Sequence, residues 1–156
     1  MAGFSYPTTG RNVSQGYSSS HPALDITGGG DISAFADGKV VYVQTDGQSG
    51  LSDSMKTLGT CVVINHNNPD TNIKAGSYAR TIYAHLASKT VSVGDSITKG
   101  SKVGVMGTTG NSTGIHLHFV LAVGNDASLA PNSSTGWVSQ GSLPTINPKT
   151  YLPNYT

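Results

Sequence analysis

Seven short segments of the chain have the composition of β-strands and constrain its fold more than any other feature. Each is apolar or alternates apolar with polar residues, and Gly, Asn, Asp or Pro separates it from the next. The segments are 33–36, 38–44, 60–65, 79–85, 90–93, 102–106 and 116–123. Nowhere does the sequence have the apolar periodicity of a helix. The pattern predicts an all-β fold, namely an antiparallel β-sandwich or open barrel.

The 156 residues have the length of one domain. We therefore expect a single domain over 1–156, with a polar lead-in at 1–20 and an irregular C-terminal strap at 124–156. Two connections, 45–59 and 67–77, are longer than a hairpin requires, and long loops on a small sheet often wall a binding groove. The lone Cys61 excludes an internal disulfide and is expected to be a small core residue.

The charge of the chain argues against several classes of function. Charged residues make up 11% of the sequence, the formal net charge is +1, and the nine Lys and Arg are scattered. We therefore expect no nucleic-acid partner. The apolar runs are too short for a membrane span. The first four residues, Met1 to Phe4, form neither a basic nor an apolar segment, so no secretory signal is expected.

Two histidines one residue apart follow a glycine-rich turn, and the residues around them predict a strand. Because alternate residues of a strand share a face, His116 and His118 are expected to point the same way. The apolar neighbours are expected on the opposite face: Ile115, Leu117 and Phe119. Two imidazoles so placed can share one metal ion, or one can bind the ion while the other faces a substrate. The spacing alone does not choose between these arrangements.

The remaining histidines extend this set. His21 and Asp25 offer one imidazole and one carboxylate, and His85 ends a predicted strand. A catalytic zinc takes three protein ligands of these types and leaves one position open for water. His66 also ends a predicted strand, where we expect an ordinary polar residue without a catalytic role.

Several motifs, in this order, resemble the lysostaphin-like (LytM-type) zinc endopeptidases, which cut peptide bonds in bacterial peptidoglycan. The matching segments are His-Pro-Ala-Leu-Asp-Ile at 21–26, Ala-Asp-Gly-Lys-Val-Val at 36–41, Val-Ile-Asn-His at 63–66, Tyr-Ala-His-Leu at 83–86, Val-Gly-Asp-Ser-Ile-Thr-Lys-Gly at 93–100, the glycine-rich run with His-Leu-His-Phe at 107–119, and Asn-Pro-Lys-Thr-Tyr-Leu at 147–152. The resemblance covers nearly the whole chain and implies the lysostaphin-like peptidase fold.

The resemblance also implies roles for individual residues. His21, Asp25 and His118 would bind one zinc ion per chain. His116 would act as general base, and His85 would hydrogen-bond the developing oxyanion or protonate the leaving amine. Five further residues would contact the substrate: Tyr17, Tyr83, Asn111, Ser112 and Thr113.

By this resemblance the partner is bacterial peptidoglycan and the place of action is the cell wall. We expect a monomer, and interpret the chain as a phage endolysin, a tail-associated lysin, or a catalytic domain cut from a longer lysin with a separate wall-binding domain. The alternative is a non-catalytic LytM-type module that binds the wall or activates an amidase; such modules are expected to lack zinc ligands. A further similarity, of 93–107 to lipoyl-carrier domains, is interpreted as shared sheet architecture.

Overall fold

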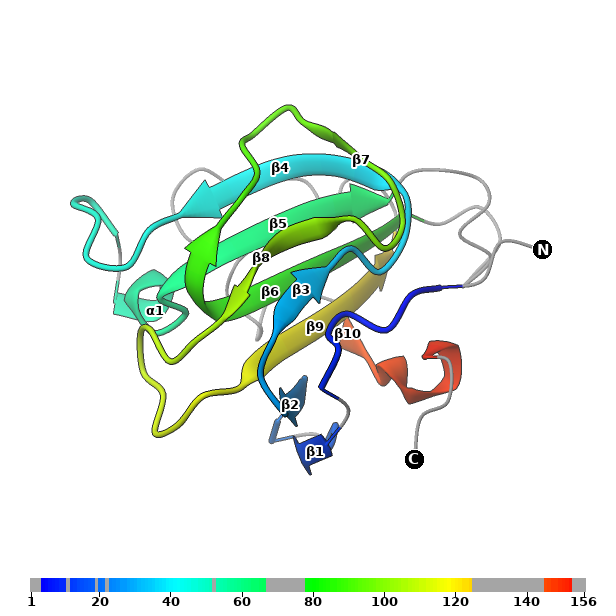
Figure 1. The fold of residues 1–156 in the computed structure, drawn as a ribbon, viewed down its shortest axis with the longest axis horizontal. Helices are drawn as coiled ribbons and strands as arrows, with labels where there is room; N and C mark the ends of the chain where they lie inside the picture. The colour runs from blue at the N-terminus through cyan, green and yellow to red at the C-terminus, as the bar shows by residue number, and fades with distance from the viewer. Residues whose placement is uncertain are drawn as a thin grey trace.

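The computed structural model describes residues 4–10, 12–18, 20–21, 23–51, 53–66, 78–124 and 145–152. Nearly all of its regular structure is antiparallel β-sheet (Figure 1). The elements are β1 (Asn12–Gln15), β2 (Leu24–Thr27), β3 (Asp31–Ser33), β4 (Gly38–Gln44), α1 (Asp53–Lys56), β5 (Thr60–His66), β6 (Tyr78–Lys89), β7 (Ser96–Ile97), β8 (Lys102–Met106), β9 (Leu117–Gly124), β10 (Thr145–Ile146) and a 3₁₀ helix (Pro148–Tyr151).

Seven strands form the main path of the sheet, in the order β1-β2-β9-β6-β5-β4-β7. β10 adds to β9, and β8 pairs with both β3 and the last part of β6. The β3–β8 pair thereby lies over one face of the main sheet, as Figure 1 shows. Every described pairing is antiparallel, which confirms the predicted fold class.

Both faces of the central strands are buried, and successive side chains alternate between two hydrophobic clusters. In β9 the larger cluster, beneath the β3–β8 pair, receives Leu117, Phe119 and Leu121. Val120 and Ala122 point into the smaller cluster on the opposite face. Because both faces are covered, β9 carries apolar residues at successive positions instead of alternating with polar ones.

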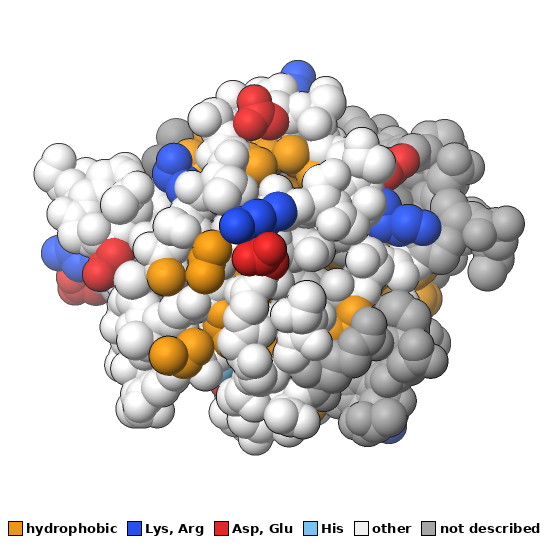
Figure 2. Space-filling view, viewed as in Figure 1, with side chains coloured by type: hydrophobic (Ala, Val, Ile, Leu, Met, Phe, Trp, Pro, Cys, Tyr) orange, Lys and Arg blue, Asp and Glu red, His pale blue; other side chains and the backbone are white. Residues whose placement is uncertain are grey.

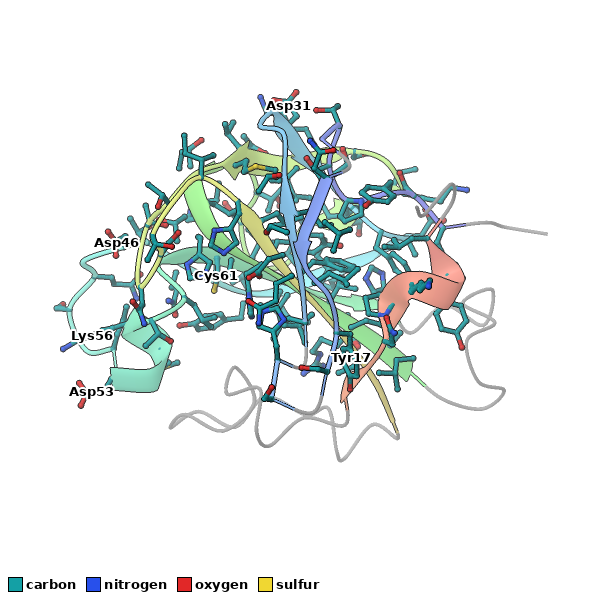
Figure 3. The ribbon with its side chains drawn as sticks, turned by 90° about the horizontal axis from the view of Figure 1, so that it is seen from below. Tyr17, Asp31, Asp46, Asp53, Lys56 and Cys61 are labelled. Carbon is teal, nitrogen blue, oxygen red and sulfur yellow. The ribbon has the colours of Figure 1, made fainter. Side chains whose placement is uncertain are left out.

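The connection between β4 and β5 covers part of the smaller cluster. Met55 of α1 and Leu58 are buried there with Cys61 of β5, which is labelled in Figure 3. The Gln44 carboxamide donates hydrogen bonds to the carbonyls of Met55 and Gly59, both at 2.7 Å. Burial raises the pKa of the Cys61 thiol, in keeping with a core residue. The four residues of α1 are too few to give the periodicity by which a helix is predicted.

The predicted strand at 90–93 is wrong. Gly94 has a φ of 96°, and the Ser92 N–H donates to Asp95 Oδ2 at 2.9 Å, so this segment forms a turn. Val93 is 60% exposed at that turn. The pairing with β4 falls instead on the short β7 that follows.

Other boundaries also differ from the predictions. The strand expected at 33–36 ends at Ser33, because the Phe35 N–H donates to the Tyr83 hydroxyl at 2.9 Å and leaves the β3–β8 ladder. β6 is longer than the predicted 79–85. The loop 67–77 lies outside the described residues, as does most of the strap.

The described surface carries few charges. Figure 2 shows Lys and Arg side chains dispersed over one face, several of them beside an acidic group. One such pair joins Lys102 Nζ and Asp31 Oδ1 at 3.3 Å. Within the described ranges, no helix has the length and apolar character that crossing a membrane requires.

His66 is a buried residue at the end of β5. Its Nδ1 lies 2.9 Å from the Asp37 carbonyl oxygen and its Nε2 lies 2.7 Å from Thr81 Oγ1. Because a carbonyl only accepts hydrogen bonds, Nδ1 carries the proton of the neutral ring. Burial lowers the pKa of His66 from its ordinary value of 6.5 to about 4.

Acid should therefore destabilise the protein through His66. Between pH 6.5 and about 4 the unfolded chain binds a proton at this side chain that the folded protein does not, so the free energy of unfolding falls as the pH falls. The loss should approach about 3 kcal/mol at the acid end. Urea unfolding of the wild type and of His66→Gln measures it, because contributions of the histidines common to both proteins cancel in the difference. A difference that is constant with pH would contradict this assignment.

Candidate metal and catalytic site

Neighbouring strands bring the central side chains of the site together. Asp25 of β2 lies directly opposite His118 of β9. Because opposed residues of an antiparallel pair share a face, their side chains meet, and Asp25 Oδ1 is 3.0 Å from His118 Nδ1. His21 comes from the loop that enters β2 and places its Nε2 3.2 Å from Asp25 Oδ2.

These three side chains could hold a zinc ion. Their candidate ligand atoms all lie within 4.8 Å of one another. A tetrahedral zinc with bonds of about 2.0–2.1 Å spaces its ligands roughly 3.3 Å apart, close to the two distances from Asp25. His21 Nδ1 is 3.2 Å from the Gly16 carbonyl oxygen, which fixes the proton there and leaves the Nε2 lone pair facing the site. Two neutral imidazoles and one carboxylate are donors that zinc prefers.

The Asp25 carboxylate is stabilised in its charged form. Burial raises its pKa, but the hydrogen bond with His118 and the charges of His118, His21 and His116 lower it by more, so the net pKa lies below the ordinary value. This carboxylate is therefore ionised at neutral pH, as a metal ligand must be.

His116 lies just before β9, where its N–H donates to the Gly107 carbonyl at 3.1 Å. Its Nδ1 is 2.8 Å from the Gly114 carbonyl oxygen, so the proton of the neutral ring sits on Nδ1. Its Nε2 is 3.7 Å from Asp25 Oδ1. His116 and His118 thus both approach Asp25 Oδ1, which agrees with the prediction that the two side chains point the same way.

A β-bulge in β6 includes His85. Thr60 pairs with Leu86 while Val62 pairs with Tyr83, so β6 has one residue more than β5 over this interval. His85 has a φ of 63°, a left-handed conformation that is uncommon outside glycine and that often occurs at functional sites. A bulge of this kind changes the direction of a side chain next to an active site.

The bulge turns His85 toward the other histidines. Ala84 faces the smaller cluster, so regular alternation would turn His85 to the opposite face of the sheet. Instead its ring centroid is 4.9 Å from that of His116 and 5.5 Å from that of His118. Its Nδ1 is 2.7 Å from the Thr109 carbonyl oxygen, and burial lowers its pKa to about 4. These three histidines form a second group whose candidate ligand atoms lie within 4.8 Å of one another.

Two loops meet beside this group through a close approach of their backbones. The Asn111 N–H donates to the Thr57 carbonyl at 2.9 Å, and the His85 N–H donates to the Leu58 carbonyl at 2.8 Å. Gly110 has a φ of 74°, and a Cβ there would lie 2.4 Å from the Gly59 nitrogen. Only glycine fits this contact.

The site opens into two adjoining cavities. The first is lined by Gln15, His21, Asp25, Thr57, Leu58, His85, Asn111, Ser112, Thr113, His116 and His118. The second is lined by Ser14, Gln15, Asp25, Thr27, Thr113, Gly114, Ile115 and His116. The part of the 45–59 connection that reaches the first cavity contributes a wall, as that loop's length suggested.

Two residues expected to contact a substrate do not line these cavities. Tyr83 is fully buried, and its hydroxyl accepts from the Phe35 N–H and lies 2.8 Å from Thr81 Oγ1. The expectation for Tyr83 is wrong, because its position in β6 points into the larger cluster, where it packs on Phe119. Tyr17 is half-buried and packs against the same cluster (Figure 3).

The interpretation of Ile115 also needs correction. The sequence predicts it on the face opposite the histidines, with Leu117 and Phe119, and these two residues are fully buried. Ile115 is 60% exposed, because it precedes the strand and belongs to the turn that lines the second cavity.

Sequence reasoning missed three residues around the histidines. Gln15 and Thr57 line the first cavity, and Thr109 presents its carbonyl to His85. Thr109 lies in the glycine-rich run and Thr57 in a long connection, and both segments were identified from the sequence as candidates for the site. No sequence feature indicated Gln15, since it reaches the site only through the pairing of β1 with β2.

The β-sheet fold and the cluster of histidines with Asp25 are features of a metallopeptidase domain. Comparison with known sequences identifies the family. Residues 19–131 match Peptidase family M23, and the chain belongs to this family. Two curated relatives from Vibrio cholerae serotype O1 are named peptidoglycan DD-endopeptidases. ShyB is 32% identical over 122 residues, 77% of this chain and 23% of that protein. ShyA is 35% identical over 86 residues, 55% of this chain and 18% of that protein.

Solved structures show the same fold. A zinc-containing peptidase from Vibrio cholerae aligns with a TM-score of 0.62 and 25% identity, over 78% of this chain and 37% of that one. The catalytic domain of lysostaphin from Staphylococcus simulans aligns with a TM-score of 0.58 and 26% identity, over 94% of this chain and 88% of that domain. The lysostaphin-like fold is thereby confirmed. The chain spans less than a quarter of the length of the two curated relatives.

Gly110→Ala should destabilise the protein by about 1–3 kcal/mol, because the new Cβ meets Gly59 at a positive φ. Gly114→Ala is the matched control in the same loop, since a Cβ there meets nothing within 4 Å, and it should change stability by less than about 0.5 kcal/mol. Urea unfolding midpoints compare the two. Equal midpoints for the two variants would contradict the prediction, because they would show that the loops can move apart with little loss of stability.

Proposed function

We propose that this chain is a zinc-dependent endopeptidase that hydrolyses peptide bonds in bacterial peptidoglycan, in the stem peptide or the cross-bridge. The observation that carries the proposal is the convergence of His21, Asp25 and His118 on one point, with His85 and His116 beside it. Membership of a peptidase family supports peptide hydrolysis, and the names of the two curated relatives support peptidoglycan as the substrate.

His21, Asp25 and His118 would hold the zinc ion, one per chain. When bound, zinc supplies a Lewis acid that polarises a carbonyl and acidifies water. The carboxylate and the two imidazoles leave the ion a net positive charge, which suits this chemistry. The complete donor set weighs against the alternative of a non-catalytic LytM-type module.

His116 is proposed as the general base. Its contact with the Gly114 carbonyl holds the proton on Nδ1, so Nε2 presents a lone pair. That nitrogen faces Asp25, where it can take a proton from water beside the metal ligands. The proton it accepts at Nε2 is then available to the leaving amine.

His85 is proposed to begin each cycle as an acceptor. Its Nδ1 donates to the Thr109 carbonyl, so the neutral ring has an unprotonated Nε2. Because burial lowers the pKa of His85 to about 4, the ring is neutral at pH 7. It can therefore donate a hydrogen bond to an oxyanion, or protonate the leaving amine, only after it has received a proton.

Substrate contacts are proposed for Asn111, Ser112 and Thr113, which line the cavity that contains the histidines. We further propose that the chain forms one domain, acts as a monomer on the cell wall, and belongs to a phage or other cell-wall lysin. A wall-binding domain in a longer protein would accompany it.

Metal content and lysis test this function together. The purified protein should bind one zinc ion per chain and should reduce the turbidity of cell walls. Chelation should abolish the lysis, and added zinc should restore it. One zinc per chain without lysis of any wall tested would favour the non-catalytic module. Mass spectrometry of the released fragments would identify the bond that is cut.

His118→Ala and His116→Ala should separate the two roles. His118→Ala should lose zinc and activity together, because a zinc with one open position has no protein ligand to spare. His116→Ala should keep its zinc and lose about 10²–10⁴-fold in kcat, as for an acid–base residue. Zinc content and turbidity loss are measured on the same samples. Loss of metal from His116→Ala would make His116 a ligand and refute the assignment.

A further inference from the structure

The two cavities adjoin across the site, so a chain lying in them passes over the catalytic group. Four residues line both: Gln15, Asp25, Thr113 and His116. The first cavity extends to Thr57 and Leu58, and the second extends to Thr27 and Ile115. Gln15 is the shared residue that belongs neither to the proposed catalytic group nor to the segment 111–113.

A β-bulge in β1 places Gln15 at this junction. Val13 pairs with Ile26 and Gln15 pairs with Asp25, so Ser14 is the extra residue on β1. The Ser14 hydroxyl donates to the Asp25 carbonyl oxygen at 3.3 Å, which ties the bulge to β2. In a regular strand, Gln15 would pair one residue earlier in β2; the bulge sets it opposite Asp25.

The chemistry of the walls matches a peptide backbone. Gln15 and Thr113 are both exposed, so their polar groups can reach a ligand. The carboxamide of Gln15 and the hydroxyl of Thr113 can each donate and accept hydrogen bonds. A peptide unit also offers one donor and one acceptor, so these groups can pair with it. Among the described lining residues of both cavities there is no Lys, Arg or Glu, and the single Asp is Asp25. Neutral dipoles of this kind recognise backbone amides and give little attraction to charged side chains.

We propose that Gln15 is a substrate-binding residue whose carboxamide hydrogen-bonds a backbone amide of an extended, uncharged peptide segment, in cavities that Thr113 also lines. The proposal rests on the proposed function, and it names the class of substrate segment that lies over the metal ligands. Gln15 is proposed to contact an amide other than the one that is cut, so it would bind ground state and transition state alike. Its loss should therefore raise KM and leave kcat unchanged.

The test compares Gln15→Met with wild type on a soluble cross-linked muropeptide released from walls that the wild type lyses. Methionine keeps the length of the side chain and removes its hydrogen bonds. KM should rise about tenfold, with kcat within about twofold and zinc content unchanged. Gln48→Leu, an exposed glutamine in the 45–59 connection, is the matched control and should keep the wild-type KM. An unchanged KM in Gln15→Met, or a loss of its zinc, would overturn the proposal; the latter would make Gln15 a support for Asp25.

Binding without turnover separates this proposal from the proposed function. In a zinc-loaded His116→Ala background, adding Gln15→Met should weaken muropeptide binding about tenfold by titration calorimetry. Equal affinities would refute the role of Gln15 even if the wild type is active. Absence of hydrolysis by the wild type would refute the function, whatever the calorimetry gives. The wild-type KM should change by less than about twofold between low and high salt, and a steep rise would contradict an uncharged segment.

Discussion

The contact between Asp25 and His118 is the constraint on which the rest of the site depends. Their strands pair so that the two residues are directly opposed, and the carboxylate and the imidazole meet at 3.0 Å. His21 and His116 both approach the same carboxylate. A shift of one residue between β2 and β9 would turn Asp25 to the other face of the sheet, and the donor set would be lost.

Irregular backbone positions the site residues that the regular strand pairing does not. A bulge in β6 turns His85 toward the other histidines, and a bulge in β1 sets Gln15 opposite Asp25. The close approach of Gly59 and Gly110 joins the two loops that carry one wall of the first cavity. The paired strands thereby fix Asp25 and His118, while the bulges and loops place the groups that would meet a substrate.

Backbone carbonyls determine which ring nitrogen carries the proton in three histidines of the site. Gly16, Thr109 and Gly114 each present a carbonyl oxygen to Nδ1 of a different histidine. Each therefore holds the proton on Nδ1 and directs an Nε2 lone pair inward. One histidine so prepared can bind a metal and the other two can accept protons, with no further charged side chain needed.

The sequence by itself determined the all-β class and the candidate histidines, because strand alternation and motif spacing are local properties. It placed His116 and His118 on one side for that reason. It could not place Tyr83 in the core, Ile115 on the surface, or Gln15 beside Asp25. Each of these depends on register, on a bulge or on the end of a strand, which are set by pairing between segments far apart in the chain. Tertiary structure decided them, because burial and hydrogen bonding across strands outweigh local preference.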